Sequence, residues 1–138
     1  MSHLINNWRN VVSSEIHQMS SNKIVRVSSA QYQLTPIKSW NEIEDQVENY
    51  CFQAKENKSD ILLFPEYFGI QYFSSIPEDW SDKQRIKALI EKHENYLNLF
   101  LHLSQKYELL IIGGSHPVCK EDDYIRNVAH LFTSSGNV

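Results

Sequence analysis

Hydrophobic and polar positions along the chain follow two periods. Short apolar runs bounded by small or turn-forming residues are typical of strands, and they predict strands at residues 24–31, 61–64 and 109–114. Between these runs, residues 39–56 and 81–101 carry apolar side chains at intervals of three and four, which predicts two amphipathic helices.

A fourth strand is expected at residues 127–133, after the polar segment 120–123. Helices separate the first three strands, so these strands should lie parallel through crossover connections, whereas the last two should form an antiparallel pair. The order of elements therefore predicts an α/β fold with layered helices and strands.

The length of 138 residues fits a single domain. We assign residues 24–138 to this domain. Residues 1–23 combine apolar positions at helical spacing with a polar break, so they form either an N-terminal extension or the remnant of an upstream domain.

Local signals mark the ends of several elements. Ser39 and Glu42 have the spacing of a capping box for the first helix, and Ser81 opens the second. Residues 134–137 are typical of a turn, and Val138 would begin a returning strand. We therefore expect the chain to be cut from a longer one, with an uncovered sheet face, and to be poorly stable or to associate when isolated.

Charge and composition exclude several classes of function. The net charge is −4 and the basic residues are scattered, so nucleic acid is not an expected partner. No apolar stretch approaches the ~20 residues that span a bilayer, and no secretory signal is recognisable, so no membrane association is expected. Cys51 and Cys119 lie in no metal-ligand or CxxC spacing, which favours a reducing, cytoplasmic location.

One carboxylate holds a position that ligands favour in layered α/β folds. The second apolar run is closed by Pro65, which has no N–H for a ladder, and Glu66 follows immediately. Glu66 is therefore expected just past the carboxyl end of a central strand, where chemical groups tend to collect. The alternative is an exposed loop carboxylate or a cap of the next segment, and this stretch alone supports both interpretations equally.

Four segments together resemble the N-terminal half of carbon–nitrogen hydrolases of the nitrilase superfamily. They are VRVSSAQYQ at residues 25–33, LLFPEYF at 62–68, IIGGSHP at 111–117 and NVAHLF at 127–132, in the order and at the separations of that family. The resemblance is strongest to the branch sometimes fused behind an acetyltransferase domain, which would make residues 1–23 a remnant. It implies a four-layer α-β-β-α sandwich, of which this chain carries the first half.

The same resemblance implies hydrolysis of amides or nitriles through a Glu-Lys-Cys triad and a thioester. Glu66 alone falls on a matching position, and its implied role is general base. The family's lysine and cysteine lie beyond the fourth strand, and no residue of this chain matches them. Cys119 is interpreted as an incidental thiol in a polar loop. No metal or organic cofactor is implied, whereas a small amide or nitrile substrate and a homo-oligomer are.

Other side chains are candidates for the surroundings of this carboxylate. A carboxylate acts as a base near neutral pH when a partly dry site raises its pKa, and Phe64, Tyr67 and Phe68 are placed to supply dryness. Ordinary core packing is favoured for Phe64. Tyr67, Phe68 and His116 are substrate-pocket candidates, although a turn at His116 and Pro117 explains that histidine at least as well.

Three hypotheses follow for the function. The chain is part of an amidase-like hydrolase with Glu66 as its base, or a truncated non-catalytic product that docks on a partner, or an unrelated small α/β binding domain. The third lacks a Gly-rich phosphate loop, since Gly113 and Gly114 form only a pair that a strand-end turn explains. His93, on the apolar face of the second helix, is interpreted as a partly buried structural histidine, because no second ligand stands one turn away.

Overall fold

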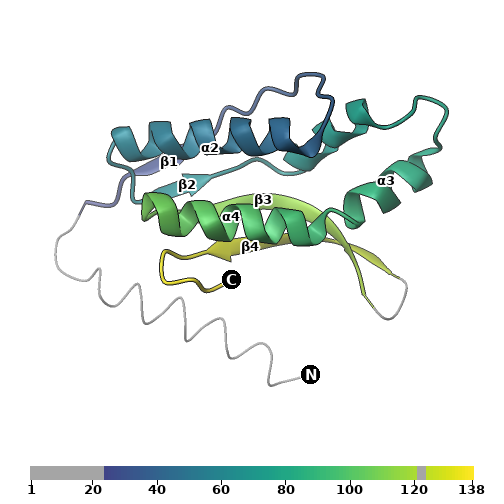
Figure 1. Cartoon of the computed structure of the whole chain (residues 1–138). Coiled ribbons are helices and arrows are strands. Elements are labelled where there is room, and N and C mark those ends of the chain that lie inside the picture. The colour runs from purple at the N-terminus through teal and green to yellow at the C-terminus, as the bar shows by residue number, and fades with distance from the viewer. Residues whose placement is uncertain (1–23, 121–123) are drawn as a thin grey trace.

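The computed structural model describes residues 24–120 and 124–138 (Figure 1). Their strands form one four-stranded sheet in the order β1-β2-β3-β4. Along the chain the elements are β1 (Val27–Ser29), α2 (Trp40–Glu56), β2 (Ile61–Leu63), the 3-10 helix η1 (Phe68–Ser75), α3 (Asp82–Ile90), α4 (His93–Tyr107), β3 (Leu110–Cys119) and β4 (Ile125–Phe132). The helix predicted before residue 23 lies outside the described residues.

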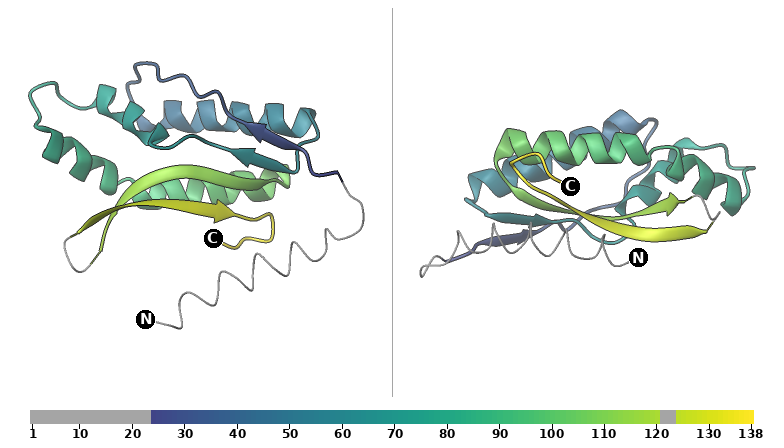
Figure 2. Two further views of the ribbon diagram at one scale, coloured as in Figure 1. Left: turned by 180° about the vertical axis from the view of Figure 1, so that it is seen from behind. Right: turned by 90° about the horizontal axis from the view of Figure 1, so that it is seen from below.

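The sheet has the mixed pairing expected from the order of elements. β1, β2 and β3 are parallel, and β4 runs antiparallel to β3. Helices α2 and α4 cover one face of the sheet, and Figure 2 shows no described element over the opposite face. The α/β fold class is therefore confirmed, with one layer of helices on one sheet.

The core lies between the two covering helices and the sheet. Leu62 and Ile111 are buried while their strand neighbours are only half-buried, which is the alternation expected of strands covered on one side. Cys51 of α2 is fully buried and packs there as a small hydrophobe. The helices supply most of the other large core residues, namely Ile43, Val47, Tyr96, Phe100 and Leu103.

Strand β3 carries a bulge at Gly113 and Gly114. These two residues stand opposite one residue of β4, His130, because the register shifts between Ile112 and Ser115. Gly114 has φ 70°, a left-handed conformation that favours glycine. The bulge lets β3 change its twist without ending.

The turns predicted at this glycine pair and at His116 and Pro117 are therefore wrong. β3 continues to Cys119, because the antiparallel partner β4 supplies pairing beyond the bulge, with Pro117 opposite Asn127. Cys119, predicted to lie in a polar loop, is instead the exposed last residue of β3.

The single helix predicted over residues 81–101 is also wrong, because two helices occupy this stretch. α3 ends at Ile90 and α4 begins at His93. α3 packs against η1 and β3, with Leu89 near Gly69 at the start of η1, whereas α4 packs against α2, β3 and β4. The different neighbours require two helix directions, and no glycine or proline marks the change in the sequence.

The two predicted helix starts differ in how they are capped. Ser81 and Gln84 form a full capping box, with the Ser81 N–H donating to Oε1 of Gln84 at 2.9 Å. Ser39 precedes α2 but makes no side-chain cap bond, so the capping box predicted there is wrong. The Glu42 carboxylate reaches one residue further back and accepts from the Lys38 N–H at 3.1 Å.

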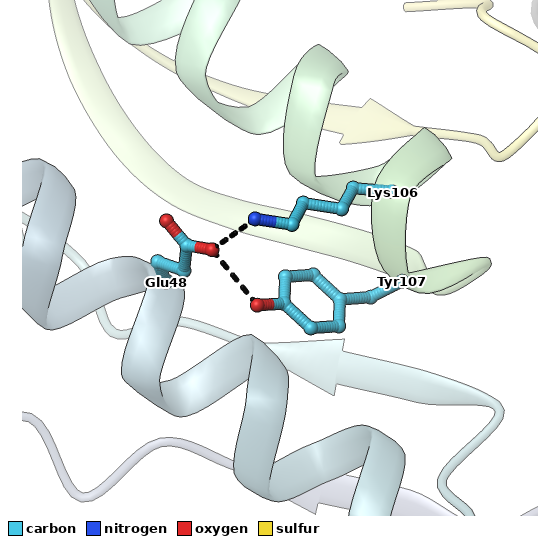
Figure 3. A network of polar contacts seen from close by, with 3 residues as sticks. All are labelled: Glu48, Lys106 and Tyr107. Carbon is cyan, nitrogen blue, oxygen red and sulfur yellow. Dashed lines mark hydrogen bonds and ion pairs between the residues drawn. The ribbon is translucent and has the colours of Figure 1, made fainter.

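Glu48 links the two covering helices at the surface. Its Oε1 accepts from the Tyr107 hydroxyl at 2.9 Å and pairs with the Lys106 ammonium group (Figure 3). The Lys106 hydrogen bond, followed by that of Tyr107, holds the pKa of Glu48 below its ordinary value. Exposed pairs of this kind add little to the free energy of unfolding, so the contact orients α2 against α4 more than it stabilises them.

The turn predicted after β4 is confirmed. The Gly136 N–H donates to the Thr133 carbonyl at 3.0 Å, and Gly136 has φ 90°. Thr133 Oγ1 also accepts from the Asn137 N–H at 3.1 Å, which closes the turn from its side chain.

Candidate active site

Glu66 lies in the turn that follows β2. The Phe64 N–H still donates to the Ile112 carbonyl of β3 at 2.9 Å, and Pro65 then ends the pairing because it has no N–H. The carboxylate therefore lies just past the carboxyl end of β2, where the sequence predicts it. Its side chain is exposed among the described residues.

Two hydrogen bonds from the neighbouring strands hold this turn. The side-chain amide of Asn127 in β4 donates to Oε1 of Glu66 at 2.8 Å, and the Tyr67 backbone N–H donates to Oγ of Ser115 in β3 at 3.1 Å. Tyr67 has φ 56°, a left-handed conformation that costs a non-glycine residue about 1–2 kcal/mol. The two bonds fix a turn that the backbone alone would not favour.

Both hydrogen-bonding partners lie on the sheet face opposite α2 and α4, where Asn127 is exposed and Ser115 is buried. Phe132 of β4 is buried beneath the helices, and side chains alternate between faces along a strand. Asn127 stands an odd number of positions from Phe132 and therefore points to the other face, as does Ser115, which pairs with Ala129. The Glu66 carboxylate is thus held from the face that no described element covers.

The aromatic residues beside Glu66 do not enclose it. Phe64 and Phe68 lie in the core, with ring centroids 5.1 and 5.5 Å from that of Phe100. Tyr67 is 44% exposed. The packing role favoured for Phe64 is confirmed and Phe68 shares it, so the dryness that a catalytic carboxylate needs does not come from these rings. Pocket roles for Tyr67 and Phe68 stay predictions.

His116 is fully buried on the helix side of β3, in a cluster with two other histidines. Its ring stacks on Tyr96 at 4.8 Å and lies 5.4 Å from the ring of His93, which lies 5.5 Å from His130. Burial is the main cause that lowers the pKa of His116 to about 4, and it also lowers the pKa values of His93 and His130. Neutral rings packed in this way serve the core, which agrees with the structural role predicted for His93. A pocket role for His116 stays a prediction, and the position of this histidine on the helix-covered face of the sheet does not favour it.

Cys51 does not have the properties of an activated nucleophile. Burial, with a smaller effect of Glu48, raises the pKa of the Cys51 thiol to about 12. That thiol is therefore protonated at neutral pH and enclosed in the core. Cys119 lies at the exposed end of β3, with its thiol 3.7 Å from the carbonyl oxygen of the next residue.

Within residues 24–120 and 124–138, no group of three or more His, Cys, Asp or Glu side chains is arranged to hold a metal ion. None of the helices in these ranges is long and apolar enough to cross a membrane.

Sequence reasoning located Glu66 but missed Asn127 and Ser115. Both residues stand within the segments that carry the family resemblance, and both are short polar side chains on otherwise apolar strands. That polarity was a usable signal. For Ser115, this signal can be interpreted only once the bulge at Gly114 is known, because the bulge decides to which face of the sheet the following residues of β3 point.

No protein-family model matches the chain. Among curated proteins, the chain is 39% identical over 114 residues to the probable hydrolase YhcX of Bacillus subtilis (strain 168). The match covers 83% of this chain and 22% of that protein.

Solved structures match the described architecture. A carbon–nitrogen hydrolase from Helicobacter pylori G27 superposes with a TM-score of 0.63 at 19% identity, over 82% of this chain and 37% of that one. An amidase from Nesterenkonia sp. gives 0.62 at 17% identity, over 85% and 43%. Saccharomyces cerevisiae Nit3, a member of branch 10 of the nitrilase superfamily, gives 0.55 at 17% identity, over 83% and 40%. The chain has the nitrilase fold.

The nitrilase fold confirms the resemblance expected from the four sequence segments. The chain spans 22% of the curated hydrolase and between 37% and 43% of these three solved structures, so it matches only a part of each. Its single sheet with one helix layer corresponds to half of the nitrilase sandwich that the resemblance implies.

Proposed function

We propose that this chain is the N-terminal part of the catalytic unit of a carbon–nitrogen hydrolase, amidase- or nitrilase-like, in which Glu66 is the general base. The observation that carries the proposal is the placement of this carboxylate. It follows the central strand β2, lies on the uncovered sheet face, and is held by Asn127 at 2.8 Å. The names of the similar proteins, a probable hydrolase, a carbon–nitrogen hydrolase and an amidase, agree with this reaction class.

The proposed chemistry assigns Glu66 the proton transfers of both half-reactions. As a carboxylate it accepts the proton of a cysteine thiol, and the thiolate attacks the carbonyl carbon of an amide. The C–N bond breaks as Glu66 gives this proton to the leaving amine, and a thioester remains. The Glu66 carboxylate then takes a proton from water, whose oxygen attacks the thioester, and returns the proton to the thiolate as the acid is released. The lysine and cysteine of the triad have no counterpart among the residues of this chain that match the family's motifs.

The exposure of Glu66 agrees with a chain that forms only half of an α-β-β-α sandwich. A carboxylate is a stronger base in a drier site, because burial disfavours its charged form. Since Phe64 and Phe68 pack into the core, the proposed source of dryness is a second sheet over the uncovered face, as in the α-β-β-α sandwich. That sheet would cover the face from which Asn127 and Ser115 project.

The finer assignments are proposed on the same basis. The substrate class is a small non-peptide amide or nitrile, and the working protein is a homo-oligomer. The location is the cytoplasm, which the two free thiols, Cys51 and Cys119, support.

The test is Glu66→Gln in the natural protein that contains this chain, assayed on a panel of small amides and nitriles. We expect a loss of roughly 10²–10⁴-fold in turnover, about 3–5 kcal/mol of barrier, because glutamine cannot accept the proton. Glu91→Gln, at an exposed helix end, is the matched control and should keep full activity. Near wild-type turnover by Glu66→Gln would remove this residue from the mechanism.

A second candidate is a non-catalytic chain that docks on a partner through its uncovered sheet face. The observation in its favour is the apolar character of that face, on which Val27 is 54% exposed and Ile61, Leu63 and Ile112 are only half-buried. Hydrolysis of small amides by the natural protein, lost in Glu66→Gln, would decide against it.

A further inference from the structure

The contact between Asn127 and Glu66 assigns a role to a residue that the proposed triad does not include. We propose that Asn127 is a positioning residue for Glu66, whose amide holds Oε1 so that Oε2 is left to exchange protons. This inference rests on the proposed function of Glu66 as a base. Among the described residues, Asn127 alone hydrogen-bonds to this carboxylate.

The chemistry of the amide suits this role. An Nδ2 amide hydrogen donates to a carboxylate oxygen and has no proton-accepting capacity of its own, so it stays in place while the other oxygen gains and loses a proton. Hydrogen bonds to charged groups are stronger than those between neutral groups, which is enough to select one rotamer of an exposed glutamate. A neutral donor does this without adding a charge beside the base.

Both partners are tied to the same strand, which makes the contact a defined geometry. Asn127 lies within the β3–β4 ladder, flanked by the pairs of Val128 with His116 and Arg126 with Val118. The turn that carries Glu66 is tied to β3 as well, through the bond between Tyr67 and Ser115. The carboxylate and its partner are therefore both positioned relative to the segment of β3 beyond the bulge.

Three variants of the natural protein separate positioning from mere tethering. Asn127→Leu removes the donor, Asn127→Gln keeps the amide on a longer stem, and Asn98→Leu on the exposed side of α4 is the control. We expect Asn127→Leu to lower kcat about 10–100-fold with little change in KM, because misplacing a catalytic group by about 1 Å has effects of this size. Asn127→Gln should recover part of the loss, and Asn98→Leu should show none.

The pH profile provides a readout that loss of folded protein would not move. Asn127→Asp places a second carboxylate beside the base, which disfavours its charged form. The acid limb of the kcat/KM profile should therefore move to higher pH, whereas a purely structural defect would scale the whole profile down in place. An unmoved acid limb together with full kcat in Asn127→Leu would overturn the inference.

The contact can also be tested without any reaction. In ¹H–¹⁵N spectra of the 138-residue chain, the Asn127 side-chain amide should shift in Glu66→Gln, whereas the Asn98 side-chain amide should not. An Asn127 amide signal that does not shift in Glu66→Gln would show that the bond is not formed. The outcomes separate this inference from the proposed function. An active Glu66→Gln variant would overturn the role of Glu66 as the base. An inactive Glu66→Gln variant together with a fully active Asn127→Leu variant would overturn only the positioning role of Asn127.

Discussion

Gly114 of β3 lies with its backbone against Pro65, so closely that a β-carbon at Gly114 would overlap the carbonyl oxygen of Pro65. The residue after Pro65 is the candidate base, and the residue after Gly114 is Ser115, which accepts the hydrogen bond from Tyr67. The bulge and the turn of the candidate site are therefore one packed unit.

We expect Gly114→Ala to destabilise the chain by about 2 kcal/mol or more. Its φ of 70° is unfavourable for alanine by about 1–2 kcal/mol, and the methyl group meets backbone that cannot rotate away. Urea denaturation of the 138-residue chain measures the effect. The amide signals of Glu66 and Tyr67 should move most in NMR spectra.

Gly69→Ala is the matched control for that substitution. A β-carbon at Gly69 would lie 3.5 Å from the nearest atom of Leu89, an ordinary contact, and Gly69 has no positive φ. It should change the free energy of unfolding by much less than Gly114→Ala. Equal effects of the two substitutions would contradict the close packing of Gly114 on Pro65.

Acid should destabilise the chain through its buried histidines. The pKa of His116 falls to about 4 in the folded chain, mainly by burial, with His93 adding to the effect and the Leu89 backbone opposing it, whereas an unfolded histidine titrates near 6.5. Between these values the unfolded chain binds the extra proton, so the free energy of unfolding decreases as pH falls from about 6.5 to about 4. The loss from His116 alone is about 3 kcal/mol, and the lowered pKa values of His93 and His130 act in the same direction.

Comparison of variants isolates this contribution from that of the acidic residues. His116→Phe keeps a ring of similar size beside Tyr96 and removes the titrating group, so its unfolding free energy should depend less on pH in this window than that of the wild type. Asn98→Gln, on the exposed side of α4, removes no titrating group and should leave the pH dependence as it is. A His116→Phe chain with the full acid sensitivity of the wild type would assign the effect to other groups.

The uncovered sheet face should make the isolated chain associate. Val27, 54% exposed on this face, pairs with Ile61 next to it on the same side. Val27→Lys should reduce association in sedimentation velocity, because it puts a charge on the apolar face. Phe52→Lys, which removes a 51% exposed ring from α2 on the helix layer, is the control and should change association less. A wild-type chain that stays monomeric at all accessible concentrations would refute this expectation.

Sequence patterns predicted the sheet well because its connections are regular. Helical segments between the first three apolar runs predicted parallel strands there, which the pairing of β1, β2 and β3 confirms, whereas the order β1-β2-β3-β4 itself is visible only in the structure. The position of Glu66 was equally accessible, since Pro65 marks where β2 stops pairing. These features depend on residues that are near one another in the chain.

Features that depend on distant contacts were not predictable in the same way. Asn127 meets Glu66 across 61 positions, and this contact requires the register of β3 on β4. The division between α3 and α4 arises from two packing surfaces, without any breaking residue between Ile90 and His93. The glycine pair signals both a turn and a bulge, and only the presence of a partner strand selects between them.

The bulge at Gly113 and Gly114 also reverses the alternation of side chains between the two faces of the sheet, so that it differs between the two ends of β3. Before it, odd-numbered residues such as Ile111 face the helices, whereas after it an even-numbered residue, His116, does so. Deleting either glycine would restore a single phase and turn the outer half of the strand inside out. Ser115 would then face the helices and His116 would face the opposite side of the sheet, so one inserted residue separates the acid-sensitive interior from the side that holds the carboxylate.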